Sequence, residues 1–115
     1  MDILFSGKKL SKQFNEAKTM QKAFGAERSK RIRVVMMVLR AAPSLGVLAP
    51  PYSPPHRCHE LTGNRKGKLS LDLDGPCRLI IQPLHDPLPQ RPVGGLDWYQ
   101  VIAIKITGVE NTHGK

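Results

Sequence analysis

The stretch "KLSLDLDGPCRLIIQP", residues 68–83, decides the fold class of this chain. In its first half, three leucines alternate with polar residues, and this period of two is typical of a strand with one buried face. Asp74 and Gly75 are residues that tight hairpin turns favour, and a second apolar run follows them directly. The stretch therefore predicts a β-hairpin whose leucines point into the core.

Two helical segments are predicted before this hairpin. The first follows a short strand, "DILF", takes Ser6 as its N-cap and continues at helical spacing to a stop at Gly25. The second runs from Ala26 to Ala42, and Pro43 ends it. One apolar stripe follows this second segment, and basic residues crowd its remaining surface. The stripe is formed by Ile32, Val35, Met36 and Leu39, and the basic residues are Arg28, Lys30, Arg31, Arg33 and Arg40.

The remaining segments complete an α+β pattern. The proline-rich "PSLGVLAPPYSPPHR" is expected to be an ordered connection over the surface, and "WYQVIAIKIT" is expected to be the last long strand. The predicted fold has two N-terminal helices packed on one face of a small antiparallel β-sheet. The residues predicted to meet those helices are Leu69, Leu71, Leu73, Leu79, Ile81, Ile102 and Ile104.

Length and charge limit the function classes. At 115 residues, the chain is predicted to form a single domain over residues 1–115. Its formal net charge of +9 favours a polyanionic partner, such as nucleic acid, an acidic protein or an anionic membrane surface. No apolar run approaches the ~20 residues that span a bilayer, and the N-terminus lacks a signal-peptide pattern, so we expect a cytoplasmic protein. The two cysteines have no metal-binding spacing, and we expect them to be ordinary thiols.

Candidate functional residues gather around "RCHELTGNRKGK", residues 57–68. His59 precedes a turn that carries three cations, Arg65, Lys66 and Lys68. Glycines beside cations resemble a phosphate-binding loop, but the spacing is not that of a P-loop, and a plain turn is the alternative. His59 and His113 are candidates for an acid and a base, because imidazoles titrate near neutral pH. A lone histidine is nevertheless more often structural.

Arg78 lies inside the second strand of the predicted hairpin, between apolar neighbours. There its guanidinium can stabilise phosphoryl charge. The alternative is an ordinary cross-strand salt bridge to Asp72 or Asp74.

Nearly the whole chain resembles the HigB-like killer proteins of plasmid-maintenance toxin–antitoxin systems, within the RelE/ParE superfamily. The resemblance rests on "RAAPSLGVLAPP", on the "RCHELTGNRKGKLSLDL" and "RLIIQP" segments, on "DPLPQRPVGGLDW" and on the closing "ITGVENTH". It implies a RelE/ParE-like fold and an mRNA interferase that commonly cuts on the translating ribosome. The mechanism that we expect, internal attack of a ribose 2′-OH on the adjacent phosphate, needs only an acid, a base and cations, so no metal or cofactor is predicted. The resemblance also implies a HigA-like antitoxin, a helix-turn-helix protein, as partner.

Site residues follow from this resemblance position by position. The family's loop histidine corresponds to His59, its Arg-Lys pair to Arg65 and Lys66, its strand arginine to Arg78 and its terminal histidine to His113. The resemblance thus implies His59, Arg78 and His113 as catalytic residues, with Arg65 and Lys66 binding RNA phosphates. From its place in the same cationic turn, Lys68 is also expected to bind phosphate.

Three positions depart from the family pattern. Thr62 replaces a lysine, and Asn111 and Thr112 replace an aspartate and a tyrosine before the last histidine. Losing the tyrosine removes a ring on which a base can stack. A degenerate member that binds antitoxin or RNA without cutting therefore stays open. A ParE-like inhibitor of a topoisomerase is a further alternative, because that branch shares the fold while lacking the histidine pair.

Overall fold

The computed structural model describes residues 1–111. His113 and Thr112 lie outside the described residues. The regular elements are β1 (Asp2–Phe5), α1 (Lys8–Asn15), α2 (Ala17–Phe24), α3 (Ala26–Ala41), β2 (His59–Glu60), β3 (Leu69–Asp72), β4 (Cys77–Pro83) and β5 (Ala103–Asn111), with short 3₁₀ turns at Leu45–Leu48, Gly63–Arg65 and Trp98–Gln100.

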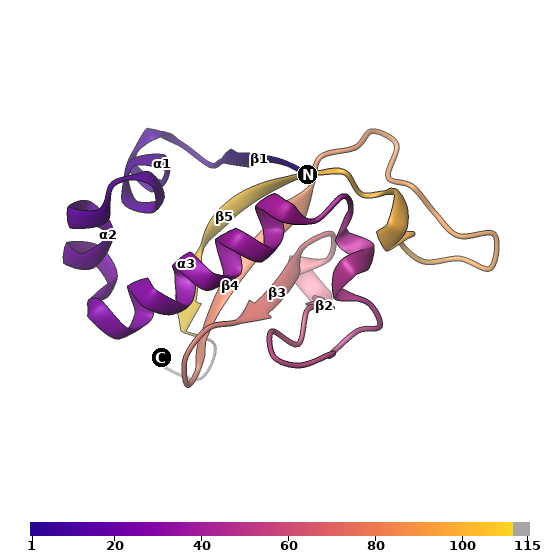
Figure 1. Cartoon of the computed structure of the whole chain (residues 1–115). Coiled ribbons are helices and arrows are strands. Elements are labelled where there is room, and N and C mark those ends of the chain that lie inside the picture. Colours follow the sequence, from indigo (N-terminus) through magenta and orange to yellow (C-terminus); the bar gives the residue numbers. More distant parts are fainter. Residues whose placement is uncertain (112–115) are drawn as a thin grey trace.

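The sheet has five strands in the order β1-β5-β4-β3-β2. Strands β2, β3, β4 and β5 pair with one another in antiparallel fashion, as the hairpin pattern predicts. The first strand differs, because β1 pairs with β5 in parallel, from Asp2 opposite Ala103 to Phe5 opposite Ile106. The sheet is therefore mixed rather than purely antiparallel. This arrangement places β1 beside the last strand of the chain, as Figure 1 shows.

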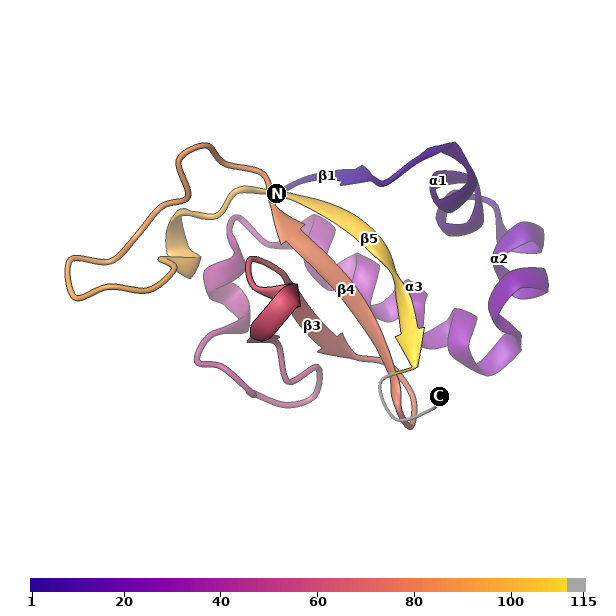
Figure 2. The same cartoon turned by 180° about the vertical axis from the view of Figure 1, so that it is seen from behind.

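The helices lie on one face of the sheet, and α3 crosses it diagonally (Figure 1). Seen from behind, α3 lies beyond the sheet, and the opposite face carries no α-helix (Figure 2). The predicted class, helices on one face of a small sheet, is confirmed. None of the helices among residues 1–111 is long and apolar enough to cross a membrane.

Three helices replace the two that the pattern predicts. The first predicted segment is interrupted at Glu16, whose φ of −118° and ψ of 120° are extended, so α1 and α2 are separate helices. Ser6 is not the N-cap of α1. Gly7 takes that position with φ 98°, a conformation that glycine adopts without steric cost, and no side chain caps the helix. The second predicted segment is confirmed as α3, which ends two residues before Pro43.

The core lies between α3 and the helix-facing side of β3, β4 and β5. Six of the seven residues predicted to form it are buried: Leu69, Leu71, Leu73, Leu79, Ile81 and Ile104. Ile102 is the exception, with 54% of its surface exposed. The last strand begins only at Ala103, because Trp98–Gln100 form a 3₁₀ turn, and Ile102 therefore precedes the strand.

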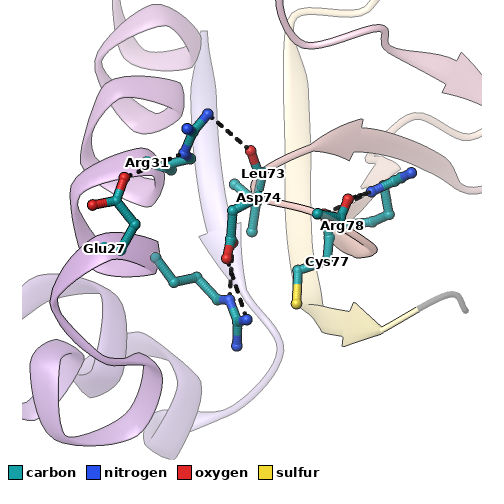
Figure 3. Close-up of polar contacts among 8 residues, drawn as sticks. Glu27, Arg31, Leu73, Asp74, Cys77 and Arg78 are labelled. Atoms are coloured by element: carbon teal, nitrogen blue, oxygen red, sulfur yellow. Dashed lines mark hydrogen bonds and ion pairs between the residues drawn. The ribbon is translucent and has the colours of Figure 1, made fainter. Parts of the chain in front are cut away.

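Polar contacts attach the start of α3 to the end of the β3–β4 hairpin. Arg28 donates through Nε to Oδ1 of Asp74 at 2.9 Å, and this hydrogen bond raises the pKa of Arg28 above its ordinary value. One turn further, Arg31 donates to the carbonyl oxygen of Leu73 at 3.4 Å. Figure 3 shows Arg31 pointing from the helix toward the hairpin, whereas Arg78 lies on the other side of the hairpin. The hairpin thus has a helix side and a helix-free side, and the candidate site is on the second.

Candidate functional site

Strand register places His59 and Arg78 on the same, helix-free face of the sheet. His59 lies opposite Ser70, and Arg78 lies opposite Asp72, two residues further along β3. Residues two apart in a strand share a face, and Leu71 between them points into the core. From the usual strand spacing and rise, the Cα atoms of His59 and Arg78 are about 12 Å apart. They share a face without contacting each other.

The ring of His59 has two defined neighbours. It stacks on the ring of Tyr52, with centroids 4.2 Å apart and planes 12° from parallel. Its Nδ1 lies 2.9 Å from the carbonyl oxygen of Arg57. A carbonyl oxygen only accepts hydrogen bonds, so Nδ1 carries the proton in this contact, and the neutral ring has its lone pair on Nε2. This contact favours the tautomer in which Nε2 of the neutral ring can act as a base.

Arg78 is engaged by the end of the hairpin. Its Nε lies 3.0 Å from Oδ1 of Asp72, and both side chains are largely buried, with 14% and 22% of their surface exposed. The Oδ1 atom is fully buried and accepts no hydrogen bond within residues 1–111, so this contact is an ion pair only. Arg78 also donates through Nη1 to the carbonyl oxygens of Gly75, at 2.7 Å, and Cys77, at 3.0 Å. Of the two alternatives for Arg78, the cross-strand pair with Asp72 is therefore present.

Arg65 reaches across the helix-free face. It follows β2 at one edge of the sheet, yet its Nη2 donates to Oε1 of Glu110 on β5. Because β3 and β4 lie between β2 and β5, the turn Gly63–Arg65 must extend over them. The turn appears in front of β3 in Figure 2. Ser70 and Ile80 are consistent with this cover, since they point to the same face and are buried.

The three cations of the turn differ in their surroundings. Arg65 has 35% of its side chain exposed and Glu110 has 40%, so solvent and ions can compete for this pair. Lys66 is exposed, Lys68 is partly exposed, and no ion pair involves either of them within residues 1–111. Lys66 and Lys68 are thus the cations most available to an incoming phosphate.

The prediction that His113 joins His59 at one site stays a prediction, because His113 lies outside the described residues. The described chain ends at Asn111, which pairs with Cys77 at the turn end of β4. Arg78 is the next residue of β4, and it pairs with Glu110. The last described residues therefore lie at the same end of the sheet as Arg78.

The cysteines do not supply a nucleophile to this face. Cys58 and Cys77 are both free thiols and both buried. Burial raises the pKa of Cys58 to about 12, so its thiol stays protonated near neutral pH. Within residues 1–111, no three His, Cys, Asp or Glu side chains are grouped so that they could hold a metal ion.

Sequence reasoning missed two residues that contact the site. Tyr52 stacks on His59, and Arg57 lies with its Cζ 5.3 Å from the centre of the Tyr52 ring and its Nη1 3.4 Å from Asp72. Both belong to the proline-rich connection, where no periodicity marks a side chain as facing the sheet. The tyrosine in "PPYSPP" and the arginine immediately before Cys58 and His59 were the available signals.

Comparisons with known proteins identify the fold. No family model and no curated protein matches the chain. Among solved structures, a YoeB/ParE toxin from Agrobacterium tumefaciens matches with a TM-score of 0.56 and 9% identity, over 96% of this chain and 98% of that one. A YafQ mutant from E. coli matches with a TM-score of 0.56 and 17% identity, over 97% of this chain and 93% of that one. The YoeB dimer from Staphylococcus aureus matches with a TM-score of 0.53 and 14% identity, over 96% of this chain and 94% of that one. At these identities the likeness concerns the backbone, and the chain has the RelE/ParE-like toxin fold.

Proposed function

We propose that this protein is the toxin of a type II toxin–antitoxin system, and that it cleaves mRNA on the ribosome without a metal ion. The fold likeness to YoeB/ParE and YafQ toxins supports the toxin role. The net charge of +9 supports an RNA partner. The observation that carries the proposal is His59, whose Nδ1 contacts the carbonyl oxygen of Arg57 and whose ring lies on the face that also carries Arg65 and Arg78, so that Nε2 can serve as the base.

The proposed reaction is an internal transfer within RNA. Nε2 of His59 takes the proton of a ribose 2′-OH, and the oxygen attacks the adjacent phosphorus. The bond from phosphorus to the 5′-oxygen breaks, and His113 donates a proton to that leaving oxygen. The products are a 2′,3′-cyclic phosphate and a free 5′-OH, so neither water nor an oxidant is consumed.

The cations stabilise the charge that develops on the phosphoryl oxygens. Lys66 and Lys68 are available for the phosphates beside the cleaved bond, and Arg65 can exchange Glu110 for a phosphate. Arg78 lies nearer the hairpin turn and is paired with Asp72, so we assign it to a flanking phosphate. Arg65 has to separate from Glu110, and Arg78 from Asp72, before either arginine can bind a phosphate. The free-energy cost of this separation limits how tightly the two arginines bind RNA.

The proposal includes the finer assignment to the HigB-like branch. A HigA-like helix-turn-helix antitoxin is then the partner, the protein acts in the cytoplasm, and the chain from residue 1 to 115 forms one toxin domain. Purification with a small helix-turn-helix protein from the neighbouring reading frame supports this branch. A neighbouring antitoxin of another class contradicts it.

The test is induction of the protein in cells, followed by growth measurement and mapping of mRNA ends. We expect growth arrest and new 5′-OH ends, both lost in His59→Ala and in His113→Ala. His85→Ala is the matched control, because His85 accepts a hydrogen bond from the Ile102 amide at 3.1 Å and, within residues 1–111, forms no hydrogen bond or ion pair with His59, Arg65 or Arg78.

Three outcomes contradict the proposal in different ways. Ends that carry a 5′-phosphate indicate hydrolysis by water instead. Soluble wild-type protein that leaves growth and mRNA intact favours a chain that only binds antitoxin or RNA. Arrest with intact mRNA and inhibited DNA supercoiling favours a topoisomerase inhibitor.

A further inference from the structure

The connection between Pro50 and Cys58 contains two unusual backbone conformations. Tyr52 has φ 67° and Arg57 has φ 47°, and they are the only non-glycine residues with positive φ among residues 1–111. A side chain makes this region unfavourable for both. The amide of Tyr52 donates to the carbonyl oxygen of Cys58 at 2.9 Å, and the amide of Arg57 donates to that of Ser53 at 2.8 Å, which fixes both residues.

Both strained residues contact His59. Tyr52 supplies the stacked ring, 4.2 Å away and 12° from parallel, and this contact defines the plane of the imidazole. Arg57 supplies the carbonyl oxygen that accepts from Nδ1 at 2.9 Å, and this contact defines how the imidazole is turned within that plane. Together they determine where Nε2 points.

The contacts of Arg57 secure Tyr52 in turn. The guanidinium carbon of Arg57 lies 5.3 Å from the centre of the Tyr52 ring, within the range of a cation–π interaction. Its Nη1 lies 3.4 Å from Oδ2 of Asp72, the carboxylate that pairs with Arg78. The connection is therefore attached to the sheet through the same aspartate.

Burial does not explain the position of Tyr52, since 52% of its surface is exposed. An exposed aromatic ring at a strained backbone position contributes little to a core. Strained residues persist where the surrounding structure over-determines them, and they concentrate at functional sites. Among residues 1–111, the stacking and cation–π contacts of the Tyr52 ring are those with His59 and Arg57.

We propose that Tyr52 is a positioning residue for His59 in RNA cleavage. Its ring holds the imidazole plane so that Nε2 lies within hydrogen-bond distance of the attacked 2′-OH. This inference rests on the proposed function, because it presumes that His59 is the base. A base acts only within about 2.6 to 3.2 Å of the proton it removes, and a displacement of about 1 Å can cost 100-fold in rate. Loss of the ring should thus lower kcat more than it raises KM.

The experiment compares Tyr52→Phe, which keeps the ring, with Tyr52→Leu, which removes it. Both variants retain a side chain at the same strained φ, so the backbone cost is matched. Tyr99→Leu is the control, because Tyr99 is an exposed tyrosine, 69% accessible, in a different turn. The readouts are kcat and KM for cleavage of mRNA bound to ribosomes, and the NMR chemical shift of the His59 Cε1 proton in the free protein, which a stacked ring displaces.

We expect Tyr52→Phe to stay within about twofold of wild type and to keep the displaced His59 shift. Tyr52→Leu should lose the displacement and lower kcat by about 10- to 100-fold with KM nearly unchanged. The positioning role is overturned if Tyr52→Leu loses the displacement but cuts at the wild-type rate, or if the wild-type His59 proton shows no displacement. Failure of the proposed function is a separate result, recognised when the wild-type protein and His59→Ala are equally inactive while the displaced shift is present.

Discussion

Replacing Arg78 by alanine tests whether this arginine holds the hairpin as well as the substrate. Arg78→Ala removes the ion pair with Asp72 at 3.0 Å and the two hydrogen bonds to the carbonyl oxygens of Gly75 and Cys77. It also leaves the fully buried Oδ1 of Asp72 without its nearest cation. Arg57, 3.4 Å from Oδ2, is then the remaining cation on that carboxylate.

The structure gives the size of the effect. Each hydrogen bond contributes about 1 kcal/mol net, and the partly buried ion pair about 1 kcal/mol more, so the free energy of unfolding should fall by about 3 kcal/mol. For a domain of this size, that lowers Tm by roughly 10 °C. Because the variant is destabilised, its RNA cleavage has to be measured at a temperature at which it is fully folded.

The assay is urea unfolding followed by the fluorescence of Trp98, the single tryptophan, which is buried. Arg91→Ala is the control. Arg91 is exposed in a loop and forms no side-chain ion pair within residues 1–111, so its loss should change stability by less than about 0.5 kcal/mol. A double-mutant cycle with Asp72→Asn should show coupling between the two positions. If Arg78→Ala lowers the free energy of unfolding by less than about 0.5 kcal/mol, Arg78 does not stabilise the hairpin as inferred.

Three further predictions concern charge and titration. RNA affinity should fall with added salt, with a log–log slope of about −2 if Arg65, Lys66 and Lys68 each neutralise a phosphate, whereas a flat dependence contradicts their role. Burial raises the pKa of Cys58 to about 12, so a thiol reagent at pH 8 should modify it only in denaturant; rapid modification of the native protein would contradict this burial. Burial lowers the pKa of His56 in the folded protein below its ordinary value of 6.5. At pH values between the folded pKa and 6.5, the unfolded chain therefore binds more protons than the folded protein, and the free energy of unfolding falls as the pH decreases. The difference in the free energy of unfolding between pH 7.5 and pH 5 should be smaller for His56→Gln than for the wild type. Equal differences for the two proteins would contradict the lowered pKa of His56.

Local patterns in the sequence determined the hairpin and the long helix. The alternating leucines at residues 69, 71 and 73 specify which face of β3 is buried, because successive side chains of a strand point to opposite faces. In the same way, the stripe that includes Ile32 and Leu39 specifies the buried side of α3. These features follow from spacing within one element and need no knowledge of the rest of the chain.

Boundaries and strand direction depended on neighbouring elements. The parallel pairing of β1 with β5 joins residues about one hundred positions apart, and no periodicity in "DILF" indicates its partner or direction. Ile102 continues the alternation of the last strand in the sequence, but the 3₁₀ turn before Ala103 delays the strand, so Ile102 is exposed.

The site shows the same division. Sequence spacing placed His59 beside a cationic turn and left Asp72 and Asp74 as equal partners for Arg78. Tertiary structure separated them, because α3 brings Arg28 to Asp74 at 2.9 Å and leaves Asp72 to Arg78. It also brought Tyr52 of the proline-rich connection onto His59. The connection reaches this position through hydrogen bonds among its own amides and through Arg57, which pairs with Asp72 of β3 fifteen positions away, and no periodicity in the proline-rich segment indicates either kind of contact.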